Sequence, residues 1–290
     1  MRRLQRRSTV LGLRAGGTAV IAGAMLSSAI FAGVPSAGAV PRPLGTLLKI
    51  AADDLTTDPA GATVVARGHV QVTYGGALAK SDLFRLNRPA RAAELSGHVV
   101  VTDPRGRASG DAVTLRLGPN DQIVSFVVTG HAGFESPKYA LSADQITADQ
   151  RSGRLAAEGH LTAFSAPDLI ITGERGAYDQ RTQYGVVTGH AAASSKEGRL
   201  QGDWIELFRA AGRAVVHGPV EADLSGATIT GDQATIDFRT SAAVFAGRVV
   251  VMRQQGTMWA DRATIFYGDR RIIAEGATRA TLTDLGEVAP

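Results

Sequence analysis

The sequence predicts an all-β protein: an elongated antiparallel β-jelly roll or β-solenoid of about eight repeats, each near 29 residues long. Three observations predict this fold. Two residue series recur in phase along the chain, apolar and polar residues alternate around both series, and no sustained apolar stripe of period 3.6 follows residue 40. The 34 glycines and the low aromatic content of 6% also fit tightly turned β units better than a helical enzyme.

The two series are a row of glycines and a row of acids, here called the repeat glycines and the repeat acids. The acid precedes its glycine by 15 residues in seven repeats, and by 19 in the third, where "GPND" at 118–121 adds four residues typical of a turn. The glycines are Gly68, Gly97, Gly130, Gly159, Gly189, Gly218, Gly247 and Gly276. The acids are Asp53, Asp82, Asp111, Asp144, Glu174, Asp203, Asp232 and Asp261.

Each series marks one long strand with a single buried face. The positions two before, two after and four after the repeat glycines hold apolar residues in 23 of 24 cases, and polar residues fill the intervening positions. Apolar residues also predominate two and four positions after the acids. Each repeat is therefore expected to contribute two strands, with a kink at the glycine and at the acid.

The chain divides into three parts in order. Residues 1–39 are expected to be an export signal, because a basic segment is followed by a weakly apolar stretch and by the small residues Ala37-Gly38-Ala39; a retained membrane anchor is the alternative. Residues 45–282 are expected to form the single repeat domain, and residues 283–290 a polar tail.

Charge and cysteine content exclude several functions. The leader holds five of the 31 basic residues and no acid, so the remainder carries 26 basic and 27 acidic groups, and no nucleic-acid partner is expected. The absence of cysteine excludes disulfides and zinc-thiolate sites. No catalytic motif is present, so we expect no enzymatic activity and no cofactor; Trp204 and Trp259 are interpreted as packing or edge residues.

Five of the six histidines follow a repeat glycine, as in "RGHV" at 67–70. In an antiparallel roll such equivalent residues lie about 9–10 Å apart, twice the strand spacing, which is too far to share a metal. They are also out of phase with the apolar positions, so we expect them to face solvent. A parallel β-helix, the alternative fold, would stack them about 4.8 Å apart.

Two segments carry a resemblance to a known family: "IAADDLTTDPAGATVVARGHVQV" at 50–72 and "ITGDQATIDFRTSAAVFAGRVVV" at 229–251. They resemble the LptA/OstA-like lipopolysaccharide-transport family in the Ala-or-Gly–Asp pair that opens one strand and the Gly-x-Val element in the next. The resemblance implies a periplasmic jelly roll that bridges the inner and outer membranes and holds the lipid chains of lipopolysaccharide in its apolar interior. From the residue pattern itself we expect no metal.

The resemblance also implies partners and a binding surface. The edge strands are expected to pair with inner-membrane and outer-membrane transport proteins, or with a second copy head to tail. Alternative functions are a structural or adhesive repeat protein, or a β-helix enzyme acting on polysaccharide, which would need clustered, non-repeating acids or bases. The interior residues expected to contact lipid are Val70, Val72, Val99, Val101, Val113, Leu115, Leu161, Ile205, Leu207, Val220, Ile236, Val249 and Ile265.

Overall fold

The computed structural model describes residues 48–104, 106–119, 122–165, 167–268 and 271–282, and these form 18 strands. The expected signal at 1–39 and the expected tail at 283–290 lie outside these residues. The strands are β1 (Lys49–Ala51), β2 (Asp54–Thr57), β3 (Thr63–Tyr74), β4 (Ala77–Asn87), β5 (Ala92–Asp103), β6 (Gly106–Leu117), β7 (Ile123–Glu135), β8 (Tyr139–Asp149), β9 (Arg154–Ser165), β10 (Leu169–Asp179), β11 (Tyr184–Ser195), β12 (Gly198–Phe208), β13 (Arg213–Leu224), β14 (Ala227–Asp237), β15 (Ala242–Arg253), β16 (Gly256–Phe266), β17 (Arg271–Glu275) and β18 (Arg279–Leu282).

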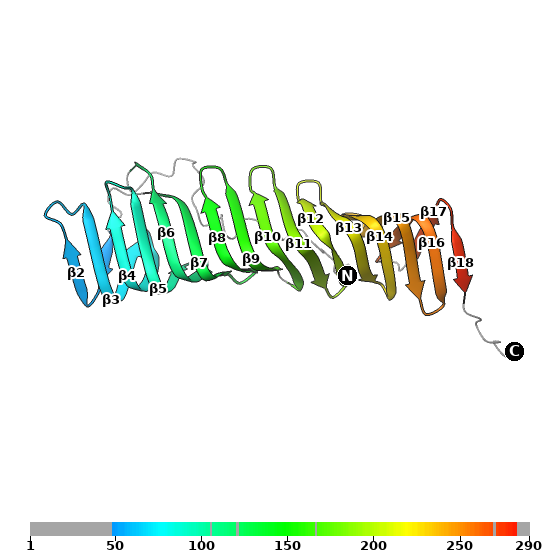
Figure 1. Ribbon diagram of the computed structural model, residues 1–290, viewed down its shortest axis with the longest axis horizontal. Coiled ribbons are helices and arrows are strands. Elements are labelled where there is room, and N and C mark those ends of the chain that lie inside the picture. The colour runs from blue at the N-terminus through cyan, green and yellow to red at the C-terminus, as the bar shows by residue number, and fades with distance from the viewer. Residues whose placement is uncertain (1–47, 105, 120–121, 166, 269–270, 283–290) are drawn as a thin grey trace, which may run out of the picture.

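The strands form one elongated antiparallel sheet in which each strand from β3 to β16 pairs with its neighbours in chain order (Figure 1). The antiparallel jelly-roll prediction is confirmed, and the parallel β-helix alternative is wrong. At the two ends, β1 and β2 both pair with β3, while β17 and β18 both pair with β16. Each of these end pairs is one long strand interrupted at a repeat position, so the eight predicted repeats are all present.

Every repeat has the predicted kink. Between β4 and β5, for example, the register shifts between Lys80 and Leu83, where Asp82 of one strand meets Gly97 and His98 of the other. Such a shift is a β-bulge, which bends the strand and increases its twist. Recurring bulges fold the sheet along its length, and this fold encloses the apolar face.

The repeat glycine is required for two physical reasons. All eight have positive φ, from 70° at Gly130 to 89° at Gly218, a region that costs other residues free energy. A Cβ atom at Gly97 would also collide with the carboxylate of Asp82, and the same holds for the other repeat glycines and their acids. The two series in the sequence therefore reflect one close contact, between the repeat glycine and the repeat acid, which recurs in all eight repeats.

The core lies inside the folded sheet and runs the length of the molecule. The alternation of buried and exposed residues along β13, β14 and β15 follows the predicted inward positions. Phe245, Leu161 and Ile265 are among the largest fully buried side chains. The four-residue insertion falls between β6 and β7 in the sequence, and the amide of Gly118 donates to the carbonyl of Gln122 at 2.7 Å. No helix among the described residues is long and apolar enough to cross a membrane.

Candidate functional site

The two long rims of the folded sheet approach each other near its C-terminal end. One rim is made of turns that follow a glycine strand, such as the turn at Ser225 between β13 and β14. The other is made of turns that follow an acid strand, such as the turn at Tyr267 after β16. The Ser225 hydroxyl donates to the carbonyl of Tyr267 at 3.5 Å, although the residues are 42 positions apart. This line of approach is here called the seam.

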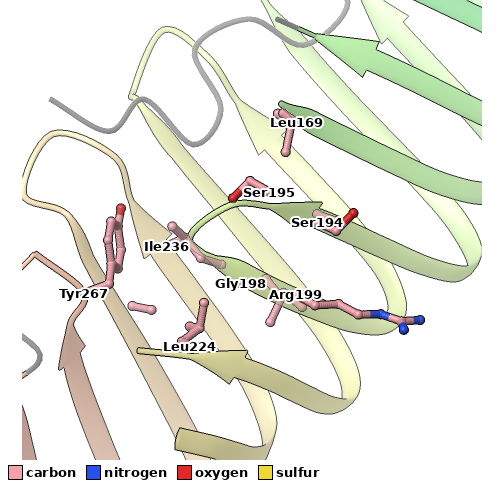
Figure 2. Close-up of a pocket in the computed structure, with 11 residues that line it drawn as sticks. Leu169, Ser194, Ser195, Gly198, Arg199, Leu224, Ile236 and Tyr267 are labelled. Carbon is pink, nitrogen blue, oxygen red and sulfur yellow. The ribbon is translucent and has the colours of Figure 1, made fainter. Parts of the chain in front are cut away.

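A hollow lies at the seam and is lined by residues of both rims (Figure 2). Leu169, Leu200, Leu224 and Ile236 give it apolar walls. The residues around it are Leu169, Ala193, Ser194, Ser195, Gly198, Arg199, Leu200, Leu224, Ile236, Ala243 and Tyr267. The hollow is thus lined mostly by aliphatic side chains, several of which belong to the core.

The hollow carries little charge. The Arg199 side chain extends away from the other labelled residues (Figure 2). Tyr267 is buried at 6% exposure, and this burial raises the pKa of its phenol, so the group stays neutral at physiological pH. Its hydroxyl donates to the carbonyl of Asp237 at 3.5 Å. An uncharged apolar opening of this kind favours alkyl groups over ions, because burying a charge without a partner is costly.

The thirteen residues expected to contact lipid all lie on the inner face. Val101 and Leu115 are partly buried and pack against the core, whereas the other eleven are buried within it. They extend along most of the sheet, and Ile236 is the member that also lines the hollow.

Sequence reasoning missed most of the residues around the hollow, including Leu169, Leu200, Leu224 and Tyr267. They lie at or near strand ends, outside the positions beside the repeat glycines and acids that were used to predict the inner face. The signal that could have found them is the continuation of the inward alternation: Leu224 lies six residues after Gly218. The meeting of the two rims has no sequence signal, since it depends on how sharply the bulges bend the sheet.

A second arrangement runs along the outside of the sheet. Each histidine that follows a repeat glycine lies beside the acid of its own repeat, and all five imidazoles are at least 90% exposed. From Nδ1 to the carboxylate oxygen, the distances are 2.7 Å for His69–Asp53, 2.9 Å for His98–Asp82, 3.4 Å for His131–Asp111, 3.0 Å for His160–Asp144 and 3.8 Å for His190–Glu174. The solvent-facing position agrees with the sequence prediction, but the pairing was not foreseen.

The pairing has a measurable electrostatic effect. The hydrogen bond to Asp53 raises the pKa of His69, and the hydrogen bond to Asp82 raises the pKa of His98. The available signal was the separation between acid and histidine, which is 16 residues in four of the five pairs and 20 between Asp111 and His131. Within the described ranges, no three histidine or acidic side chains converge into a group that could hold a metal ion.

Comparisons with known proteins find a family match and similar solved structures. Residues 228–288 match the family model of the LptA/(LptD N-terminal domain) LPS transport proteins, which confirms over that segment the resemblance found in the sequence. Among solved structures, the chain is similar to LptH, the LptA homologous periplasmic component of the conserved lipopolysaccharide transport device from Pseudomonas aeruginosa. That similarity has 16% identity and a TM-score of 0.37, and it covers 40% of this chain and 94% of LptH. A search of curated proteins finds no match.

Proposed function

We propose that this protein is a periplasmic lipopolysaccharide carrier that holds acyl chains in the apolar interior of its roll. The observation that carries the proposal is the buried apolar interior, together with the mostly apolar hollow at the seam. The family match over 228–288 supports lipopolysaccharide transport as the process.

The interior has the physical character that acyl chains require. Each methylene transferred from water to an apolar surface contributes about 0.8 kcal/mol, so even partial entry of one acyl chain supplies a useful driving force. The core is filled mainly by aliphatic side chains, with Val70, Leu161 and Val249 almost fully buried at different places along its length. Lipid entry would therefore separate the rims at the seam and displace contacts among these side chains.

The sheet ends support a bridging role. All four residues of β2 and all four residues of β18 are exposed, and Leu55 and Leu282 are 52% and 79% exposed. An exposed edge strand presents unpaired backbone groups that another strand can complete. We propose that one edge receives an inner-membrane transport partner, and the other an outer-membrane partner or a second copy of the chain.

Photocrosslinking in cells tests the proposal at three positions along the roll. A photoreactive residue placed at Val99, Leu115 or Leu207 should capture lipopolysaccharide, because all three side chains face the interior. Val100 and Thr114 are the matched controls, since each adjoins a tested position and faces outward in the alternation of β5 and β6. Absence of adducts at all three inward sites, in folded and expressed protein, would exclude lipid carriage and favour a structural or adhesive role.

A further inference from the structure

An aromatic and charged cluster lies on the outer face of the sheet. It is centred on Trp204 and Glu206 of β12 and His217 of β13, with Tyr184 of β11 and Gln233 of β14 at its sides. Burial along these strands alternates, and the neighbours Val187, Ile205 and Val216 point into the core. Figure 1 shows β11–β14 side by side in the middle and C-terminal part of the sheet.

The cluster departs from the repeat. At the place of Trp204, the other seven repeats have Asp54, Leu83, Ala112, Gln145, Arg175, Gln233 and Arg262. At the place of Glu206 they have Thr56, Arg85, Thr114, Thr147, Ala177, Thr235 and Thr264. An outward position needs neither an aromatic ring nor a carboxylate to build the roll, so the structural repeat does not explain these residues.

The polar groups of the cluster form one connected network. Tyr184 donates its hydroxyl proton to Oε1 of Glu206 at 2.6 Å, and His217 Nε2 lies 2.7 Å from Oε2 of the same carboxylate. The amide nitrogen of Gln233 lies 3.2 Å from His217 Nδ1. These contacts hold Glu206 as a carboxylate and fix its orientation, and the hydrogen bond from Tyr184 is the largest cause of its lowered pKa. Each oxygen of this carboxylate keeps a further lone pair for an incoming donor.

Trp204 presents a flat apolar surface beside this network. One face of its indole stacks on the imidazole of His217, with ring centroids 4.6 Å apart and planes inclined by 12°. The residue nevertheless remains 39% exposed. Across the adjacent strand its register partner is Thr188, so the side chain on the other side of the indole is a short one.

The surface beneath is also apolar. Val215 lies opposite Glu206 in the register and is only 9% exposed, although it faces outward and lies outside the interior core. The outer face therefore has a small apolar floor, a rigid indole and an oriented carboxylate in one place. Trp204 packs against His217, which agrees with its interpretation as a packing or edge residue, and it is also part of this exposed surface.

We propose that this cluster is a carbohydrate-binding subsite that takes one pyranose ring on the free face of Trp204. A pyranose has an apolar face of C–H groups, which suits a rigid indole, and a rim of hydroxyls, which suits a charged acceptor. The hydroxyls would donate to Glu206 and accept from the amide of Gln233. This site is on the opposite face from the lipid-binding interior and does not depend on it. A sugar of this kind can come from the oligosaccharide of lipopolysaccharide or from the glycan strands of the cell wall.

The two tryptophans of the chain make a direct test possible. In Trp259→Phe, Trp204 is the sole indole, and its fluorescence reports the subsite. Two probes are titrated separately: delipidated lipopolysaccharide oligosaccharide, and soluble peptidoglycan fragments. We expect a saturable change with at least one probe in Trp259→Phe, and none in Trp204→Phe, which keeps Trp259 as the matched reporter. The probe that binds identifies the source of the sugar.

Two further variants separate binding from folding. Thr188→Arg covers the free face of Trp204 without removing any group of the hydrogen-bond network, and it should abolish the response while leaving lipid crosslinking at Leu207 unchanged. Glu206→Gln should weaken affinity at least about fivefold, because a charged acceptor is lost. No saturation with either probe up to about 10 mM, a range that includes very weak binding, would overturn the proposal. An equal response in Thr188→Arg would overturn it as well.

Discussion

The first five repeats and the last three differ at the residue that follows the repeat glycine. In the first five this residue is histidine, with φ between 45° and 50°, and it pairs with the repeat acid. In the last three it is Pro219, Arg248 or Ala277, and among these only Arg248 has a positive φ. The glycine and the acid stay the same in both regions. The bulge therefore needs the glycine and its contact with the acid. The residue after the glycine can have a positive or a negative φ and can carry several types of side chain.

The largest expected effect on stability concerns the contact between the repeat glycine and the repeat acid, which both regions share. Gly97→Ala places a Cβ against the carboxylate of Asp82 and also requires an alanine at φ 78°. Gly226→Ala is the matched control, because its φ is 75° but no atom lies within 4 Å of the new Cβ. We expect Gly226→Ala to lower the free energy of unfolding by about 1–2 kcal/mol, and Gly97→Ala to lower it by at least about 1 kcal/mol more. Denaturant unfolding of both variants measures the difference; equal losses would show that the acid does not constrain the glycine.

A reciprocal exchange tests whether the two regions have different bulges. His98→Pro forces φ to about −65° at a residue whose φ is 49°, and we expect a loss of more than about 1 kcal/mol in the free energy of unfolding. Pro219→His has no such conflict, and its loss should stay within about 1 kcal/mol, chiefly through a more flexible unfolded chain. If both exchanges had the same effect, the backbone difference between the regions would not matter for stability.

The outer cluster lies where the first region gives way to the second. Tyr184→Phe removes the hydrogen bond to Glu206 and should cost about 1 kcal/mol of unfolding free energy. Burial and this hydrogen bond raise the pKa of Tyr184 to about 12. The ultraviolet titration of the native protein should therefore lose its highest phenol transition in this variant, and an unchanged titration would contradict the network.

The smallest expected effect is a difference in pH dependence. The raised pKa values of His69 and His98 mean that their pairs contribute stability below the ordinary histidine value of 6.5, and this contribution is lost as the pH rises through the raised values. Asp232 has a pKa lowered from 3.8 by Arg248, so its pair contributes above 3.8 and loses this contribution as the pH falls through the lowered value. NMR titration should show the His98 pKa decreasing in Asp82→Asn. A rise or no change would exclude the pairing in solution.

The repeat explains why so much of the fold is predictable. Two series in phase predict kinked strands at Gly97 and Asp82, and the alternation around them assigns Val99 and Leu115 to the inner face. The contact between Gly97 and Asp82 became visible only in the structure. The contact of Ser225 with Tyr267 is different, because it joins turns 42 residues apart and depends on the bend of the whole sheet. The cluster at Trp204 could not be predicted from the sequence for another reason. Its members are ordinary polar and aromatic residues on four strands, and only the register of β11 to β14 brings them together.

One pair of adjacent residues tests the central claim that lipid occupies the inside of the roll. Ile236 faces inward and lines the hollow at the seam, while Thr235, the preceding residue of β14, faces outward. A photoreactive residue at each position should be compared in purified protein with bound lipopolysaccharide. The account predicts a lipid adduct at position 236 and none at position 235. Equal labelling at both positions, or labelling at position 235 alone, would contradict it.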